Sequence, residues 1–130
     1  MKYMLLMSFK KEVFDWYSKW PKEVLEKNFA FMRNFNKELE AAGVLVQTAG
    51  LAWPDQAKTV RAAKDGTPIT DGIFPESKEF LAGYWIIDVE NADEAYKIAA
   101  RASLAPAPEG TEGTMPIEVR QVMGGPSNEC

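Results

Sequence analysis

The chain has 130 residues, of which 46% are hydrophobic and 26% charged, which is usual for one globular domain. Its formal net charge is −4 and no cluster of Lys or Arg forms a stripe, which argues against nucleic acid as the main partner. It contains no histidine and a single cysteine, Cys130 at its last position, which excludes Ser-His or Cys-His catalysis, a disulfide within the chain and a zinc cluster.

The first part of the chain predicts a strand, a long helix and a second strand. Residues 2–9 are largely apolar at both alternating sets of positions, which is typical of a strand buried on both faces. Residues 21–42 carry apolar side chains every three or four positions, with Lys and Glu on the other face, and this predicts a helix. The apolar stripe is interpreted as core packing and consists of Leu25, Phe29, Met32, Phe35 and Leu39. Pro21 suits the first turn of the helix and Gly43 the position just past its end.

The middle of the chain predicts three further strands after the strand at residues 44–51. Residues 58–64 and 67–70 flank Asp65-Gly66, a common hairpin turn pair because both positions tolerate a positive φ. Residues 82–89, AGYWIIDV, are rich in aromatic and β-branched side chains and predict the clearest strand. The preceding stretch, TDGIFPESKEFL, is charged and is interpreted as a loop that leads into this strand.

The last part predicts a second helix and a final strand. Asn91 can accept a hydrogen bond from a free backbone N–H, and Glu94 can reach back to the cap, so a helix should begin here. Its apolar face would consist of Ala95, Ile98, Ala99 and Ala102. Residues 103–114 are a Pro/Gly-rich loop, residues 116–123 a strand, and residues 124–130 a disordered tail.

The predicted order is β-α-β, a hairpin, then β-α-β. This order indicates an α+β fold, a ferredoxin-like sandwich with an extra β-hairpin and both helices on one sheet face, in a single domain over residues 1–123. Tyr84 and Ile86 alternate with Trp85 and Ile87, so both faces of their strand are apolar. The helices can cover one face, and we expect a second copy of the chain to cover the other, as a homodimer.

Four segments together resemble the YCII-related, or DGPF, proteins. They are MKYMLLM, AAGVLV, the block TVR…KDGTPITDGIFPESKEFLAGYWIIDVENADEAYKIAAR and IEVRQVM, so the resemblance runs from about Met1 to Met123. It implies a dimeric α+β barrel, in which two sheets pack face to face and each subunit keeps a pocket between sheet and helices. The family's activity is largely unassigned, and bacterial members are often encoded near extracytoplasmic-function sigma factors.

The sequence departs from this family in two respects. The Asp-Gly-Pro-Phe signature appears here as DGIF at residues 71–74, and loss of the proline frees φ and restores a backbone N–H. The YCII branch is associated with a His–Asp pair, which a chain without histidine cannot supply.

The charged stretch after the hairpin contains the candidate catalytic residues. Asp71 and Glu76 are candidates because a carboxylate held near apolar walls can transfer protons. Lys78, Arg61 and Arg120 are candidate ligand-binding residues, since a cation could bind an enolate or carboxylate. The alternative is structural: Asp71 caps the turn, and Glu76 and Lys78 form a solvated pair.

Aromatic residues supply further ligand-binding candidates, because pockets are mostly apolar with a few polar groups. They are Trp53, Tyr84 and Trp85, although core or dimer packing is the alternative for at least one of the last two, which point to opposite faces. Glu118 and Arg120 share one face of the last strand. They would form either a charged pocket floor or an ion pair at an edge or dimer contact.

These features favour a homodimeric protein that binds a small aromatic or carboxylate ligand, or a regulatory protein. The alternatives are a cofactor-independent isomerase- or monooxygenase-like enzyme acting on a small enolisable substrate, and a structural partner in a larger complex. Neither a metal nor a cofactor is expected. No apolar segment approaches the roughly 20 residues that span a bilayer, and no signal peptide is recognisable, so a cytoplasmic location without membrane contact is expected.

Overall fold

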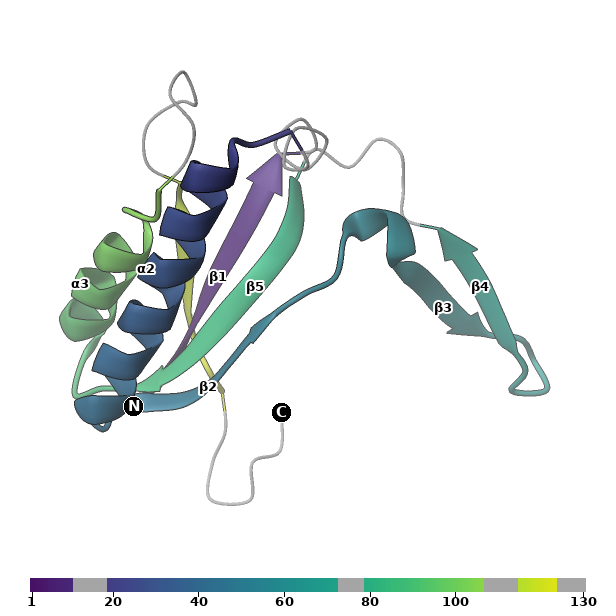
Figure 1. Ribbon diagram of the computed structural model, residues 1–130. Coiled ribbons are helices and arrows are strands. Elements are labelled where there is room, and N and C mark those ends of the chain that lie inside the picture. The colour runs from purple at the N-terminus through teal and green to yellow at the C-terminus, as the bar shows by residue number, and fades with distance from the viewer. Residues whose placement is uncertain (11–18, 73–78, 107–114, 124–130) are drawn as a thin grey trace.

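A computed structural model describes residues 1–10, 19–72, 79–106 and 115–123. Its larger part, here named the body, is an antiparallel sheet in the order β2-β5-β1-β6 with two helices on one face (Figure 1). The strands and helices of the body are β1 (Lys2–Lys10), α2 (Lys22–Ala41), β2 (Leu45–Gly50), β5 (Glu79–Asp88), α3 (Ala92–Ala102) and β6 (Ile117–Gln121). The α+β class is therefore confirmed.

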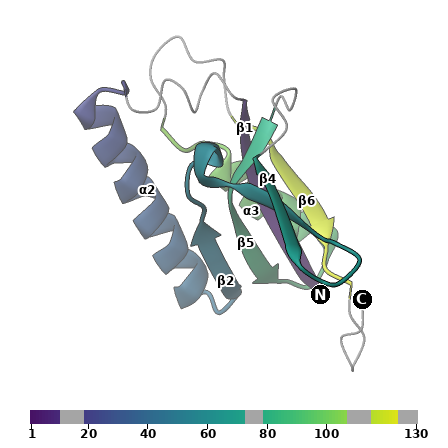
Figure 2. The same ribbon diagram turned by 90° about the vertical axis from the view of Figure 1, so that its right-hand side faces the viewer.

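The smaller part, here named the arm, is a separate two-stranded hairpin of β3 (Lys58–Ala62) and β4 (Pro68–Gly72). A single-turn 3-10 helix, η1 (Pro54–Gln56), lies between β2 and the arm. Figures 1 and 2 place the arm on the side of the sheet opposite the helices. The expected extra hairpin is confirmed, and it does not extend the main sheet.

Both ends of α2 follow from its sequence. The carbonyl of Pro21 accepts hydrogen bonds from the N–H groups of Val24 and Leu25, so Pro21 immediately precedes the helix. At the other end Gly43 has a φ of 74°, a conformation that costs glycine little. The N–H of Val44 then bonds back to the carbonyl of Leu39 at 3.1 Å, which satisfies a free helix carbonyl.

The start of α3 is as predicted for Asn91, whereas the carboxylate of Glu94 pairs with Lys97 and not with the cap. The side-chain oxygen of Asn91 accepts a hydrogen bond from the N–H of Glu94 at 3.0 Å. The Glu94 carboxylate lies 3.3 Å from the ammonium of Lys97. Asn91 therefore caps the helix, and the exposed Glu94 pairs within the helix face.

The core lies between the helices and one face of the sheet. Strand β1 contributes Tyr3, Leu5 and Met7, and β5 contributes Trp85 and Ile87. The helices complete it with Phe35 and Leu39 from α2 and with Ala95, Ile98, Ala99 and Ala102 from α3. Small alanine side chains allow α3 to lie close to the sheet, where they are buried.

The opposite sheet face is only partly covered. Its central residues are Met4, Leu6, Tyr84 and Ile86, which form two cross-strand pairs and are half-buried. The sequence pattern predicted β1 to be buried on both faces, but only the helix-facing set is fully buried. We name these four residues the open face.

Strand β5 begins three residues earlier than its sequence predicted, at Glu79 rather than Ala82. Glu79 lies opposite Lys10, and Phe80 lies opposite Phe9. Cross-strand pairing with β1, including an opposite-charge pair, extends the strand into the charged stretch. The interpretation of residues 79–81 as loop was therefore wrong.

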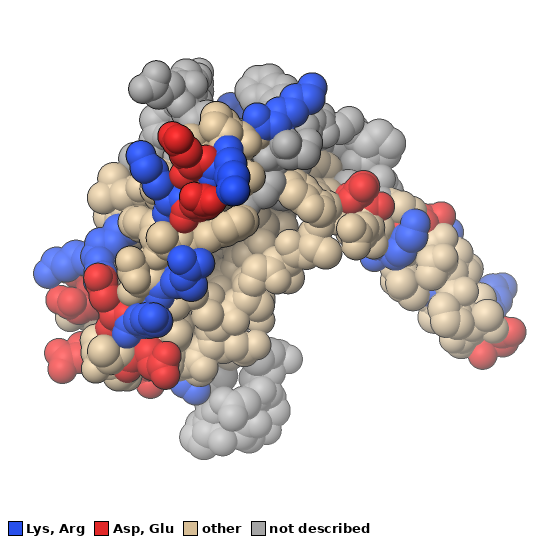
Figure 3. Space-filling model, in the orientation of Figure 1, with Lys and Arg blue, Asp and Glu red and all other residues tan. Residues whose placement is uncertain are grey.

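The arm makes most of its contacts with itself. Its turn is closed by hydrogen bonds from Ala63 N–H to the Thr67 carbonyl and from Gly66 N–H to the Ala63 carbonyl. Gly66 has a φ of 88°, so the glycine of the predicted turn pair takes the left-handed position. In Figure 3 the surface is hollowed between the body and the arm.

None of the helices in the described ranges is both long enough and apolar enough to cross a membrane.

Candidate ligand pocket

A pocket of about 250 Å³ lies between the N-terminal half of α2 and the strands β1, β2 and β5. The described residues that line it are mainly apolar or aromatic, with a few uncharged polar groups: Met7, Phe9, Asn28, Phe29, Met32, Asn36, Thr48, Ala49, Gly50, Ala82, Gly83, Tyr84 and Trp85. Concave, mostly apolar sites with a few polar groups are the usual form of small-molecule sites.

The apolar stripe of α2 explains where the pocket lies. Phe35 and Leu39, in the C-terminal half of the helix, are buried against the sheet. Phe29, in the N-terminal half, is 48% exposed, and both Phe29 and Met32 line the pocket. The interpretation of the whole stripe as core is therefore correct only for its C-terminal half.

Gly83 keeps the strands close at the pocket wall. A Cβ atom at this position would lie 2.9 Å from the carbonyl oxygen of Ala49, a backbone atom of the neighbouring strand. Gly83 also lies directly opposite Gly50 in the β2–β5 ladder. A side chain here would force the two strands apart or reshape the wall.

Asn36 is the best-oriented polar group in the wall. Its side-chain oxygen accepts a hydrogen bond from the indole Nε1–H of Trp85 at 2.7 Å. The indole is only a donor, so this contact fixes which end of the amide is the oxygen. The Asn36 NH2 group makes no hydrogen bond to the described residues.

The Trp85 ring is held in place by its aromatic neighbours. It meets the Phe35 ring edge to face, with centroids 5.5 Å apart and planes at 81°. The Arg101 guanidinium lies over the Phe35 ring, 5.2 Å from its centroid, and also pairs with Glu38. Phe35 therefore links the Trp85 ring in the pocket wall to Arg101 of α3.

Two further polar contacts tie the pocket walls together. The Thr48 hydroxyl donates to the carbonyl of Tyr84 across β2 and β5 at 2.9 Å. The Asn28 amide donates to the carbonyl of Pro106, also at 2.9 Å, and so links α2 to the segment after α3. Both groups thus use a donor within the protein, although the Thr48 hydroxyl oxygen can still accept a hydrogen bond.

The described lining contains no carboxylate and no cationic side chain, and Tyr84 is its one ionisable residue. The Tyr84 hydroxyl accepts a hydrogen bond from Gln47 at 2.9 Å. Proton transfer needs a titratable group within reach of the substrate. The described walls therefore favour binding of an uncharged molecule.

The residues predicted for ligand binding are divided between different parts of the molecule. Tyr84 and Trp85 line the pocket. Trp53 lies just before η1 and does not belong to the described lining. Arg120, on the edge strand β6, lies 3.7 Å from Glu118, with both side chains largely exposed. The two residues form the ion pair of the second interpretation, and its place at a dimer contact stays a prediction.

Of the two candidate catalytic residues, the described one, Asp71, lies outside the pocket lining. Asp71 is in the arm, with one carboxylate oxygen 4.0 Å from Nε of Arg61, and their side chains are 63% and 70% exposed. The expected proximity of Arg61 and Asp71 is thus present, but an exposed pair of this kind contributes little to stability. Glu76 and Lys78 lie outside the described residues.

Sequence reasoning missed the polar part of the pocket wall. Asn28, Met32 and Asn36 are spaced four residues apart and therefore share one face of α2. Two amides next to an apolar stripe, on a helix whose other polar positions are mostly charged, were an available signal. Thr48 gave no such signal, because its role depends on the partner strand.

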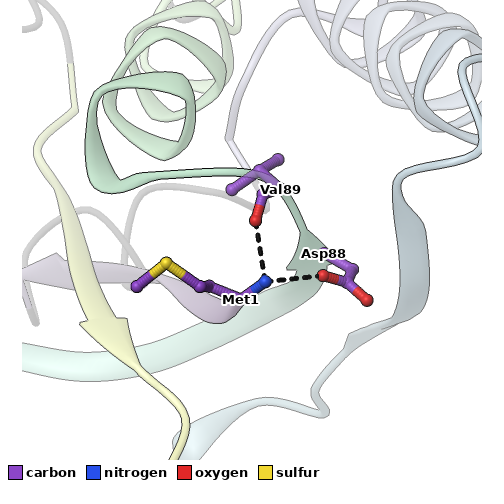
Figure 4. A network of polar contacts seen from close by, with 3 residues as sticks. All are labelled: Met1, Asp88 and Val89. Atoms are coloured by element: carbon purple, nitrogen blue, oxygen red, sulfur yellow. Dashed lines mark hydrogen bonds and ion pairs between the residues drawn. The ribbon is translucent and has the colours of Figure 1, made fainter.

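A second, wider hollow of about 650 Å³ lies at the other end of the body. In Figure 4 the Met1 amino group lies 3.0 Å from an Asp88 carboxylate oxygen and donates to the Val89 carbonyl at 2.8 Å. Arg101 and Glu38, which also line this hollow, pair with one another. Its cationic groups are thus already paired.

A metal site is not formed within the described ranges, because no three Asp, Glu, Cys or His side chains come together there. The fold and the pocket define a class of protein: a small α+β domain with a helix-covered antiparallel sheet and an apolar site between helix and sheet.

The chain belongs to the YCII-related domain family, whose sequence pattern matches residues 1–122. It is also 32% identical over 100 residues to a protein of Rhizobium meliloti (strain 1021), which covers 77% of this chain and 81% of that one. That relative is described as uncharacterised. The resemblance inferred from the sequence segments is confirmed, and the function of the family remains unassigned.

Proposed function

We propose that this chain is a homodimeric protein that binds a small, uncharged, largely apolar molecule carrying one hydrogen-bond acceptor. The observation that supports the proposal most directly is the pocket beside Asn36, whose NH2 group is turned away from Trp85 and left for a ligand. Aromatic compounds with a carbonyl group combine these features. Of the two ligand types expected from the sequence, the described lining favours the aromatic one over the carboxylate.

The size of the pocket limits the ligand. Sites for drug-sized molecules start at roughly 300 Å³, so a pocket of about 250 Å³ suits a compound of one ring with a short substituent. Met32 and Phe29 supply flexible and planar apolar surface at its helix side. The ligand gains its affinity from apolar burial and its orientation from the Asn36 amide.

The homodimer is the second part of this proposal. The open face exposes parts of four large side chains in one contiguous patch at the centre of the sheet. A ferredoxin-like sheet of this kind would bury that patch against a second copy, which would form the barrel that the family resemblance implies. The pocket and the open face share Tyr84, so the dimer is tested at Ile86, which belongs to the open face but not to the described pocket lining.

Calorimetric titration tests the ligand proposal. Acetophenone, a neutral aromatic ketone, should bind and raise the melting temperature, and benzoate should bind at least about tenfold more weakly because the described wall offers no cation. Asn36→Asp keeps an acceptor for Trp85 but replaces the free NH2 with a carboxylate, and it should weaken acetophenone binding by about tenfold.

Asn34→Asp is the matched control, because Asn34 lies on the same helix, is exposed and is outside the described lining. It changes the charge of α2 by the same amount and should leave affinity within about twofold. Equal affinity of the wild type and Asn36→Asp for acetophenone would contradict the assigned orientation. Absence of binding by all neutral aromatic compounds would contradict the pocket's function.

Sedimentation equilibrium tests the dimer. The wild type should dimerise at micromolar concentration, and Ile86→Glu on the open face should yield a folded monomer. Tyr96→Glu, at a side chain that is 55% exposed on α3, should dimerise like the wild type. A wild-type monomer at micromolar concentration would exclude the homodimer.

A further inference from the structure

The described contacts between the arm and the body are too few to stabilise the hairpin. All residues of β3 are exposed, and Ile69 is the single residue of β4 that is half-buried. An isolated two-stranded hairpin is at best marginally stable in water. The arm therefore needs a surface to pack against.

The two faces of the arm differ in chemistry. Residues directly opposite each other share a face, so one face carries the pairs Val60–Thr70 and Ala62–Pro68, with Lys58–Gly72 at its end. The other face carries Thr59 and Asp71 as one pair and Arg61 and Ile69 as the next, with the Arg61–Asp71 ion pair across it. The first face therefore groups the apolar side chains of Val60, Ala62 and Pro68, and the second carries the ion pair beside the half-buried Ile69.

Val60 is the clearest member of the apolar face. Its side chain is 59% exposed, the largest exposure of any β-branched residue among the exposed hydrophobic side chains of the described structure. A β-branched side chain at mid-strand normally packs against a neighbour on a pleated surface. Val60 would gain such packing if another surface covered this face of the arm.

The arm and the open face lie on the same side of the molecule. The arm projects from the side of the sheet opposite α2 and α3 (Figures 1 and 2), and the open face is the sheet face away from these helices. Between them the surface is hollowed (Figure 3). A body that covers the open face therefore comes against the arm as well.

We propose that the arm is an embracing element of the homodimer, whose apolar face, formed by Val60, Ala62 and Pro68, packs on a second copy of this chain. The inference rests on the proposed homodimer and adds to it a specific interface outside the sheets. In a twofold-symmetric dimer each arm would grip the other copy, so the contact would occur twice. The face with Arg61, Asp71 and Ile69 would point away from that second copy.

A matched pair of substitutions on neighbouring residues of β3 tests this. Val60→Lys places a charge on the apolar face, and Thr59→Lys places the same charge on the opposite face, next to Asp71. In sedimentation equilibrium Val60→Lys should weaken dimerisation at least about tenfold, and Thr59→Lys should change it less than about twofold.

A milder variant separates loss of contact from loss of the hairpin itself. Val60→Thr keeps a β-branched side chain, so the strand should still form, and dimerisation should weaken by about threefold to fivefold. Hydrogen exchange of the arm should slow in the wild type as protein concentration rises through the dissociation constant. In Val60→Lys it should stay fast at the same concentrations.

The outcomes distinguish this inference from the homodimer on which it rests. A wild-type dimer that neither substitution at Val60 weakens would overturn the embracing arm and leave the sheet-face dimer intact. Equal weakening by Val60→Lys and Thr59→Lys would also overturn it, since only one face should matter. A wild-type monomer would remove both proposals.

Discussion

The body and the arm are both built on antiparallel strand pairs, yet they differ in what surrounds them. Ile87 in β5 is fully buried under the helices, whereas Val60 in β3 is 59% exposed. Both are β-branched residues within a paired strand. Strand pairing fixes which face of the strand a side chain occupies. Whether that side chain is buried depends on whether a second layer, here the helices, covers the face.

The largest expected effect comes from shortening the most buried and the most exposed of these two side chains to alanine. Ile87→Ala should destabilise the body by about 2–5 kcal/mol, because it leaves a cavity in the core. Val60→Ala should cost less than about 0.5 kcal/mol in the monomer, since no core contact is lost. Urea unfolding below the dimer dissociation constant measures both.

The same pair of variants sharpens the arm proposal when the protein concentration is raised. The cost of Val60→Ala should grow with concentration if the arm packs on a second copy, while the cost of Ile87→Ala should not. Equal costs of the two substitutions at low concentration would contradict the contrast between body and arm.

A smaller difference is expected between a glycine in the body and one in the arm. Gly83→Ala should destabilise by about 1–3 kcal/mol, because its Cβ would lie 2.9 Å from the Ala49 carbonyl oxygen. Gly72→Ala should have little effect, since no atom lies within 4 Å of the added Cβ. Thermal unfolding followed by circular dichroism compares them, and a fully stable Gly83→Ala would show that β2 can shift freely.

The turn of the arm should respond locally. Gly66→Ala places a side chain at a φ of 88° and should disfavour the turn by about 1–2 kcal/mol. Amide shifts of the arm should move toward unfolded values in NMR spectra, while the melting temperature of the body stays within error. A fall in body stability would mean that arm and body fold as one unit.

The smallest effect is a pH response of the same turn. The backbone N–H of Thr67 donates to the Asp65 carboxylate at 3.0 Å, and this bond holds the Asp65 pKa below its ordinary value of 3.8. Because the folded pKa is the lower one, the bond's contribution is complete above pH 3.8 and is lost as pH falls through the folded pKa.

The Thr67 amide shift should therefore titrate below pH 3.8 in the wild type. Asp65→Asn keeps an acceptor oxygen without the charge, so its Thr67 amide should not titrate in this range. A wild-type midpoint above 3.8 would contradict the assigned bond.

Much of the body could be predicted because local signals and tertiary packing agree there. The cap of α3 at Asn91, the glycine after α2 at Gly43 and the aromatic strand β5 were each recognised from short-range patterns. The start of β5 at Glu79 was missed, because its pairing with Lys10 joins residues far apart in the sequence. Charge alone indicated a loop.

The pocket could be predicted only in part. Trp85 was a candidate from its aromatic type, but its partner Asn36 lies 49 residues away, and only the packed helix brings the two together. Asp71 was a candidate because of its charged neighbourhood, but the hairpin places it in solvent beside Arg61. In both cases the residue type made it a candidate, and its position in the fold decided whether it lies at the pocket.

By itself the sequence determined the α+β element order, the amphipathic helix of α2, the turn at Asp65-Gly66 and the family, because these depend on periodicity, capping and local conformational preference. Only the tertiary structure decided that the α2 stripe divides into core and pocket wall, and that the hairpin stands apart from the sheet. Both outcomes depend on which surfaces meet, and burial is a property of the assembled layers rather than of any one segment.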